Sequence, residues 1–247
     1  MKYDYHIHTE FSPDSRLKGT DLAAKAIACS YDEIAITEHL DLLPHELSVC
    51  GLPSLTKYRA AVTKLQSEFP DLSILFGIEI GDFHRVKDFA NSLITEIDFD
   101  IILGSVHFLS DNSNMAMPLK RALSKQQTIE YYRYNLDLVS TCDFDVLAHL
   151  GVYKRYYPYV PDESYVLPVI KDIFTTMIER KIALEINFGP LRRGYANLHP
   201  ENEHIELYKS MGGTLFSIGS DAHEIGHFDD FYDRVPSEFS TPYRYNK

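Results

Sequence analysis

Cysteine is scarce in this chain of 247 residues, which has three cysteines and no CxxC pair. Cys29, Cys50 and Cys142 are far apart, and such a scattered, odd set is typical of reduced thiols in an intracellular protein. No apolar run approaches the roughly 20 residues that a membrane span requires, and no signal-peptide pattern follows Met1. We therefore expect a cytoplasmic protein without a membrane partner.

Basic residues are also in the minority, because 24 Lys and Arg stand against 36 Asp and Glu and give a formal net charge of −12. Nonspecific nucleic-acid binders present a basic face, so we expect no nucleic-acid partner. An anionic small molecule is not excluded, since bound divalent cations can reverse the local field. The sequence leaves the oligomeric state open.

The chain has no low-complexity segment and no clear linker, so we expect a single domain over residues 1–247. Seven strand-like runs alternate with helical patterns. The runs cover residues 3–8, 33–37, 72–80, 99–106, 144–149, 182–187 and 214–220, and the helical patterns cover 21–30, 57–69, 86–96, 126–141, 169–180 and 203–211. Such alternation implies parallel pairing, and seven repeats in one barrel's length favour an α/β barrel over an open sheet.

Metal-capable side chains stand at or just after the ends of these runs. The first run ends in His6 and His8, which share one face because strand residues alternate. The full set is His6, His8, Asp14, His39, Glu79, His107, His149, Asp221 and His223. The carboxyl ends of barrel strands converge on one rim, where barrels carry out chemistry. Clustered imidazoles and carboxylates suffer a large desolvation penalty that divalent ions remove, so we expect a metal centre.

Nine ligands exceed the three or four that a single zinc site takes from a protein, so we expect two or three divalent ions with a bridging carboxylate. Glu79 is the candidate bridge, because the third strand lies between the ligands of its neighbours. Nitrogen and oxygen ligands without cysteine suit zinc, manganese or iron, and the sequence does not choose among them. Two ions about 3.5–4 Å apart can clamp a transferring phosphoryl group.

The motif order HxH, TEH, GIE, SVH, AH and SDAH, from His6 to His223, resembles that of the polymerase and histidinol phosphatase (PHP) family of metal-dependent phosphoesterases. The resemblance covers nearly the whole chain and implies a distorted seven-stranded (β/α)7 TIM-like barrel with a two- or three-metal centre. It implies one ion on His6, His8, Glu79 and Asp221, a second on Glu79, His107 and His149, and a third on Asp14, His39 and His223. Many members have a histidine where Asp14 stands, so the third site departs from the pattern.

Four stretches are similar to the histidinol-phosphatase branch of that family: EHLD at 38–41, SVHFL at 105–109, LGVYKRY at 150–156 and LEINFGPLRRG at 184–194. Pro190 departs from this pattern, because a glycine is common there. The resemblance implies hydrolysis of L-histidinol phosphate in L-histidine biosynthesis. We expect a metal-bridging hydroxide to attack phosphorus in line, without a covalent intermediate. Glu79, Asp221 and His223 are the candidate catalytic residues, and Asp221 or a metal-bound water is the candidate proton donor.

Charged residues after the fifth and sixth runs are candidates for binding the substrate. Arg192 and Arg193 follow the sixth run, which is the one that ends without a ligand, and a guanidinium binds phosphate oxygens in a fork. Lys154 and Arg155 form a second candidate pair. Further candidates are Asn187 for orienting the substrate and Asp41 and Glu46 for its ammonium group. Of the histidines outside the metal set, we expect His45 and His199 to come nearest the rim.

Other functions stay open. The same metal centre could act on another phosphate monoester, such as a nucleotide or phosphotyrosine, or the chain could be a catalytically silent metal-binding module. An amidohydrolase is less favoured, because the strands offer no obvious position for a carboxylated lysine. No Ser-His-Asp arrangement, phosphate-cradling glycine loop or cysteine nucleophile motif competes with the phosphoesterase interpretation.

Overall fold

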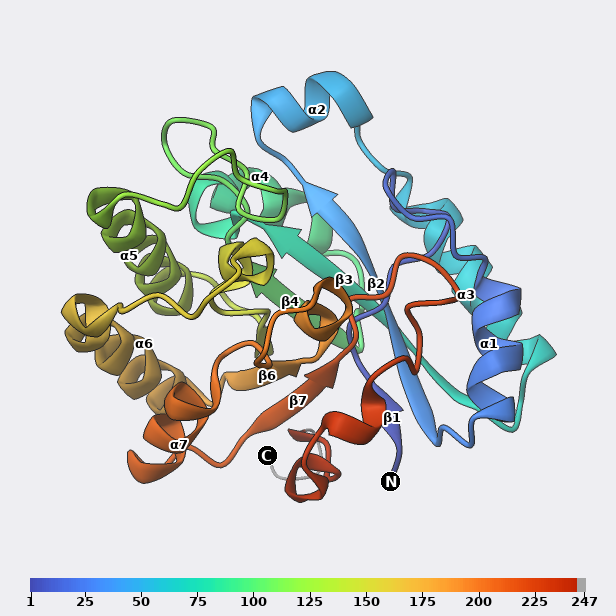
Figure 1. The fold of residues 1–247 in the computed structure, drawn as a ribbon. Coiled ribbons are helices and arrows are strands. Elements are labelled where there is room, and N and C mark those ends of the chain that lie inside the picture. Colours follow the sequence, from blue (N-terminus) through green and yellow to red (C-terminus); the bar gives the residue numbers. More distant parts are fainter. Residues whose placement is uncertain (244–247) are drawn as a thin grey trace.

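Seven parallel strands form one sheet whose spatial order follows the sequence in the computed structural model, which describes residues 1–243 (Figure 1). The strands are β1 (Tyr3–Asp4), β2 (Glu33–Asp41), β3 (Ser73–Gly81), β4 (Ile101–Ser105), β5 (Val146–Leu147), β6 (Ala183–Asn187) and β7 (Phe216–Gly219). Each strand pairs in parallel with its neighbour along the chain. The predicted seven-stranded α/β barrel is confirmed.

The barrel is nearly closed by the segment that follows the short strand β1. Backbone N–H groups of Tyr5 and His8 donate to the carbonyl oxygens of Ile218 and Ala222, each at 2.9 Å. The N–H of Asp221 donates in return to the carbonyl of His6 at 2.8 Å. The two ends of the sheet are therefore joined beside the residues of the predicted metal centre.

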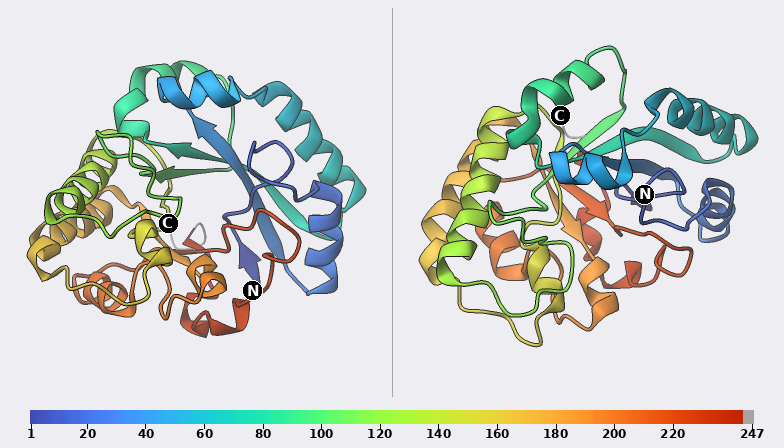
Figure 2. Two further views of the ribbon diagram at one scale, coloured as in Figure 1. Left: turned by 45° about the horizontal axis from the view of Figure 1, so that its top comes forward. Right: turned by 90° about the horizontal axis from the view of Figure 1, so that it is seen from above.

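Helices surround the sheet on the outside (Figures 1 and 2). They are α1 (Gly19–Ala28), α2 (Pro44–Cys50), α3 (Leu55–Glu68), α4 (Phe83–Ile94), α5 (Lys125–Thr141), α6 (Leu167–Arg180) and α7 (Asn202–Ser210). The loops of the described part of the chain contain five 3₁₀ helices: η1 (Val152–Tyr156), η2 (Ser164–Val166), η3 (Gly189–Arg193), η4 (Tyr232–Arg234) and η5 (Ser237–Phe239). Within residues 1–243, none of the helices has the length and apolar character required to cross a membrane.

The core has two parts because side chains alternate along the strands. On β2 and β3, Ile34 and Phe76 pack in the larger apolar cluster with side chains of the surrounding helices. Ala35 and Leu75 instead belong to a second cluster with the β4 residues Ile101 and Leu103. The strands are therefore buried on both faces, as parallel strands in α/β folds usually are.

Several local predictions differ from the structure, and β5 (Val146–Leu147), for example, is shorter than the predicted run 144–149. The first strand has only two residues. Beyond it, Tyr5 and His8 bond to the β7 side, while the carbonyl of Ile7 still accepts from the N–H of Thr37 on β2 at 2.8 Å. The second strand runs to Asp41, four residues beyond the predicted end, because its pairing with β3 continues to Gly81. Helix α2, which has no buried residue, was not predicted. The single-domain prediction for residues 1–247 stays a prediction.

Candidate metal centre

Glu79 lies at the centre of a group of histidines at the carboxyl ends of the strands. Its strand, β3, lies between β2 and β4, so side chains from both neighbours can reach it. His149 Nε2 lies 2.9 Å from Glu79 Oε1, and His39 Nδ1 lies 2.9 Å from Oε2. Further imidazole nitrogens lie 3.4–3.5 Å from this carboxylate and belong to His6, His8 and His107. The structure thus brings together one carboxylate and five imidazoles from the predicted ligand set.

Asp221 supplies a second carboxylate, just after β7. Its Oδ1 lies 3.5 Å from His8 Nε2, 3.8 Å from His6 Nε2 and 3.6 Å from His223 Nδ1. The backbone of Asp221 has a φ of 54°, in the left-handed region that residues other than glycine seldom adopt. Strain of this kind is often retained where it orients a functional side chain.

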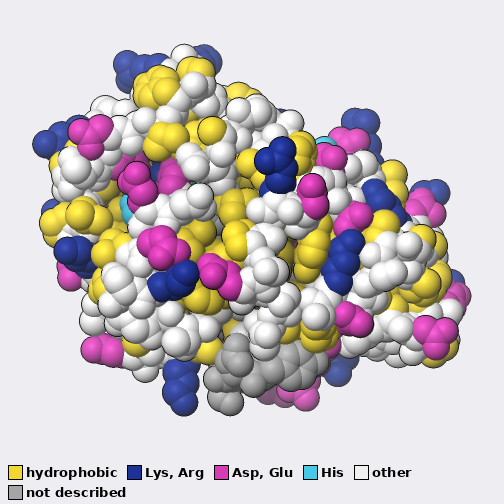
Figure 3. All heavy atoms as spheres, turned by 60° about the horizontal axis from the view of Figure 1, so that its bottom comes forward, with side chains coloured by type: hydrophobic (Ala, Val, Ile, Leu, Met, Phe, Trp, Pro, Cys, Tyr) yellow, Lys and Arg dark blue, Asp and Glu magenta, His cyan; other side chains and the backbone are white. Residues whose placement is uncertain are grey.

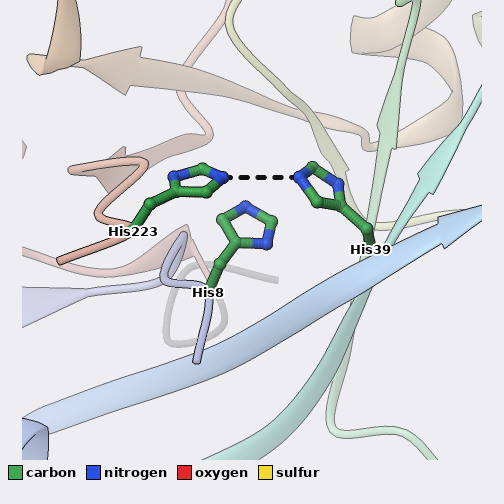
Figure 4. Close-up of side chains that lie close together, drawn as sticks. All are labelled: His8, His39 and His223. Atoms are coloured by element: carbon green, nitrogen blue, oxygen red, sulfur yellow. Dashed lines mark hydrogen bonds between the residues drawn. The ribbon is translucent and has the colours of Figure 1, made fainter. Parts of the chain in front are cut away.

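Three histidines from distant parts of the chain converge at the outer side of the centre (Figure 4). The Nε2 atoms of His39 and His223 are 3.4 Å apart, and the ring of His8 stacks on both imidazoles. Asp14 is more exposed, with 59% of its side chain accessible, and its Oδ2 lies 3.3 Å from His223 Nε2 and 3.6 Å from His39 Nε2. The predicted donors His8, His39, His223 and Asp14 are therefore close together.

The donor set fits divalent metal ions. His6 Nε2 and His8 Nε2 are buried and have no hydrogen-bond partner among the described residues, which is unfavourable unless another group satisfies them. Four groups of three donors have ligand atoms within 4.8 Å of one another: His6–His8–Asp221, His6–Glu79–His149, His8–His39–His223 and His39–Asp41–His107. These residues can therefore hold metal ions, and the assignment of individual ligands stays a prediction.

The charges within the cluster oppose the effect of burial. Burial alone would raise the pKa of Glu79, but His6 and His107 outweigh it and hold that pKa well below its ordinary value. Burial alone would lower the pKa of His107, whereas the carboxylates of Glu79 and Asp41 raise it to about 10. The pKa of His8 is well below its ordinary value, because burial and the neighbouring His39 and His223 both disfavour its cation. The cluster thus contains ionised carboxylates and a neutral His8, and binding of an ion at His107 would require that imidazole to release its proton.

Two residues of the centre were missing from the predicted ligand set. Asp41, predicted as a substrate contact, lies with Oδ1 3.3 Å from His107 Nδ1 and Oδ2 3.7 Å from His39 Nδ1. Glu185, from the strand predicted to bring no ligand, is buried, and its Oε1 lies 2.7 Å from His6 Nδ1. In the sequence, the acidic positions of the EHLD and LEINFG motifs were the signals that could have identified Asp41 and Glu185.

A cleft of about 530 Å³ opens over the metal centre. Donor residues form one part of its wall, including His39, His107, His149, Asp221 and His223. Basic side chains form another part, namely Arg155, Arg192 and Arg193. The remaining wall includes Glu46 and Cys50 from α2. The cleft therefore combines candidate metal ligands with cations that can bind an anion.

Two of the predicted substrate contacts do not line this cleft. Lys154 is buried, and its ammonium lies 2.6 Å from Glu201 Oε1 and 3.2 Å from Glu163 Oε2, so its charge is already paired. Asn187 is buried too; its amide donates to Glu185 Oε2 at 3.1 Å, and its oxygen accepts from the N–H of Gly189 at 2.9 Å. The hydrogen bonds of both side chains are directed to other residues of the protein, and their contact with a substrate stays a prediction.

Among the histidines outside the predicted ligand set, His227 lines the cleft, whereas His45 and His199 are not part of its wall. His45 packs its ring on Phe108 with ring centroids 4.5 Å apart. His199 is fully buried and is outside the cleft wall.

The PHP domain family model matches residues 4–188 of this chain. The match spans well over half of the sequence, and the chain therefore belongs to the PHP family. The family resemblance inferred from the order of the histidine and acidic motifs is thereby confirmed.

Curated relatives of similar length carry a more particular name. A histidinol-phosphatase of Lactococcus lactis is 30% identical, with 90% of this chain and 84% of the relative covered. A probable histidinol-phosphatase of Clostridium acetobutylicum is also 30% identical, with 90% and 87% covered. A solved structure of histidinol phosphate phosphatase from L. lactis, complexed with zinc, L-histidinol and phosphate, is 27% identical. It has a TM-score of 0.75 and covers 90% of this chain and 86% of its own.

Proposed function

We propose that this chain is a metal-dependent phosphoric monoester hydrolase that converts L-histidinol phosphate to L-histidinol and phosphate. The observation that carries the proposal is a single cleft in which buried metal donors face three arginines. The names of the relatives support this substrate, and so does the L. lactis structure with zinc, L-histidinol and phosphate. The reaction would place the chain in L-histidine biosynthesis.

We assign two or three ions of zinc, manganese or iron to the predicted ligands. The first would be held by His6, His8, Glu79 and Asp221, the second by Glu79, His107 and His149, and the third by Asp14, His39 and His223. One donor group, His6–His8–Asp221, lies within the first of these sites. The other three groups combine donors that the division assigns to different ions, as expected where neighbouring ions share one cluster, and Asp41 joins His39 and His107 as an additional donor. When bound, the ions lower the pKa of the attacking water and stabilise the charge of the phosphoryl oxygens.

Side chains of the cleft would hold the ester in place. Arg155 lines the cleft with its Nη1 2.9 Å from Asp221 Oδ2, so its guanidinium lies beside the metal donors where a phosphate oxygen would bind. Arg192 donates from Nη2 to the carbonyls of Ser220 at 2.7 Å and Asp221 at 3.0 Å, which orients its guanidinium at the cleft wall. Glu46, on the α2 side of the cleft, is suited to the cationic end of L-histidinol phosphate.

Asp221 stays ionised in this arrangement. Burial alone would raise its pKa, but His223, His6 and Arg155 outweigh burial and hold that pKa well below its ordinary value. We therefore assign the proton of the leaving oxygen to water rather than to the Asp221 carboxylic acid. Asp221 and Glu79 instead supply negative charge that holds the ions.

The test is phosphate release from L-histidinol phosphate by protein loaded with zinc or with manganese. Nucleotides, phosphotyrosine and sugar phosphates at the same concentration provide the comparison. A strong preference for L-histidinol phosphate is expected. Activity confined to another ester would overturn the assignment of L-histidinol phosphate as the substrate but would leave the phosphoesterase activity in place. If metal-loaded protein hydrolyses none of the esters, a catalytically silent metal-binding module is favoured.

A further inference from the structure

Lys154 stands next to Arg155 in the sequence, but its side chain lies in a buried polar cluster outside the cleft wall. We call this group the lysine cluster; it consists of Lys154, Tyr132, Glu163 and Glu201. The Lys154 ammonium lies 2.6 Å from Glu201 Oε1 and 3.2 Å from Glu163 Oε2. It also donates to the hydroxyl of Tyr132 at 3.3 Å. The lysine is thus held by three elements far apart in the sequence.

Each acidic partner of Lys154 is itself held by a tyrosine. Glu163 Oε2 accepts from the hydroxyl of Tyr132 at 2.9 Å, and Glu163 Oε1 accepts from the hydroxyl of Tyr153. Glu201 Oε1 accepts from the hydroxyl of Tyr195 at 2.8 Å. A buried ion pair contributes little net stability compared with apolar packing, but its geometry favours one conformation over others. The cluster is therefore suited to fixing the position of η1, which carries Lys154.

The backbone of η1 couples Lys154 to its neighbour. Residues of a 3₁₀ helix are spaced about three per turn, so adjacent side chains leave the axis in directions about 120° apart. The turn begins at Gly151, which has a φ of 91°, and a Cβ on this residue would lie 2.7 Å from Lys154 Cε. With Lys154 fixed, Arg155 is directed to the cleft, where its Nη1 lies 2.9 Å from Asp221 Oδ2.

We propose that Lys154 is a positioning residue that aims the Arg155 guanidinium at the phosphate group of the substrate. The identity of that substrate rests on the proposed function. Lys154 does not touch the anion. It acts through η1, and the lysine cluster replaces the direct phosphate contact that the sequence suggested. Loss of the ammonium lets η1 move and misplaces the arginine, and a shift of this kind weakens binding of the anion.

The experiment uses the full-length, metal-loaded protein with the substitutions Lys154→Met, Arg155→Met and both together. Lys209→Met is the matched control, because Lys209 pairs with Glu206 and Glu238 at an exposed site on α7. Binding of inorganic phosphate is measured by calorimetry, and the KM and kcat for L-histidinol phosphate are measured beside it. Metal content is determined for every variant.

For Lys154→Met we expect phosphate binding to weaken by roughly ten- to a hundredfold, with KM raised and metal content unchanged. In the Arg155→Met background the same substitution should add no further loss, because both changes remove one interaction. A purely structural role would instead give equal losses in both backgrounds, and that result would overturn the proposal. Unchanged phosphate binding in Lys154→Met would overturn it too.

A second variant covers the case in which Lys154→Met does not fold. Glu163→Gln keeps the lysine and its contact with Glu201 while removing one charge from the cluster. Glu163→Gln should weaken phosphate binding less than Lys154→Met does, and it should cause no further loss when combined with Arg155→Met. Phosphate binding equal to that of the wild type would refute the positioning role. Because phosphate binding needs no turnover, an inactive wild-type protein would refute the proposed substrate without deciding the role of Lys154.

Discussion

Glu185 Oε1 lies 2.7 Å from Nδ1 of His6, and both side chains are buried. A carboxylate accepts at this nitrogen, so Nδ1 carries the proton and the lone pair of Nε2 is left for the metal centre. Burial alone would lower the pKa of His6, but Glu185 and Glu79 outweigh it and raise that pKa well above its ordinary value. Strand β6 therefore contributes to the centre through His6.

Replacing Glu185 by glutamine should weaken zinc binding about 10- to 100-fold, because the partner of a ligand histidine is then uncharged. The amide still accepts a hydrogen bond, so we expect the fold to be kept. Competition between the protein and a zinc chelator measures the affinity. Glu68→Gln, at an exposed position on α3, is the control. Equal zinc affinity in both variants would show that Glu185 does not support the centre.

Replacing Glu79 by glutamine should abolish phosphate release and reduce the number of ions bound per chain. Glu79 contacts imidazoles on both sides of the centre, so the loss of its charge affects each group of donors that it joins. Elemental analysis of the purified variant gives the metal content, and a phosphate assay gives the activity. Undiminished turnover at full metal content would disprove the bridging role.

Arg192→Met should lower kcat/KM more than Arg193→Met does. Arg192 holds the backbone carbonyls of Ser220 and Asp221 and lines the cleft, so its loss affects both the anion and the segment that carries Asp221. The guanidinium of Arg193 lies over the ring of Tyr156 at 5.0 Å. Steady-state kinetics of the two variants give the comparison, and a larger loss in Arg193→Met would reverse the assignment.

His84 should make the protein less stable as the pH falls from about 6.5 to about 4. Burial, together with Arg85, lowers the pKa of His84 from 6.5 to about 4, whereas the unfolded chain keeps the ordinary value. Between these pH values the unfolded chain binds more protons than the folded chain, so the free energy of unfolding decreases as the pH is lowered. His84→Phe should remove this part of the pH dependence. Urea unfolding of both proteins at pH 5 and pH 7 tests it, and equal pH dependence would contradict the prediction.

The sequence was sufficient to bring the strand-end histidines and acidic residues together, because the position of a residue along a parallel strand determines which rim of the barrel and which face of the sheet its side chain occupies. It was insufficient for Asp41, since the extension of β2 depends on pairing with β3. Gly81 is part of the reason: a Cβ there would lie 2.0 Å from Asp41 Oδ1, so the carboxylate fits only beside a glycine. Such a requirement comes from contacts between strands and leaves no local pattern.

Lys154 and Arg155 illustrate a second limit of the sequence. Two adjacent basic residues in a loop suggest one shared anion site, but the turn of η1 sends the two side chains in different directions. The buried partners of Lys154 come from positions 163 and 201, which no spacing rule connects to position 154. Helix α2 was missed for a related reason, as its lack of buried residues leaves it without an apolar period.

The closure of the barrel joins residues 5–8 to residues 218–222. His6 and His8 are therefore synthesised more than two hundred residues before Asp221 and His223. Because synthesis runs from the N-terminus, the growing chain contains Glu79, the first carboxylate partner of these histidines, well before Asp221. An ion captured before β7 is complete would meet only part of the donor set.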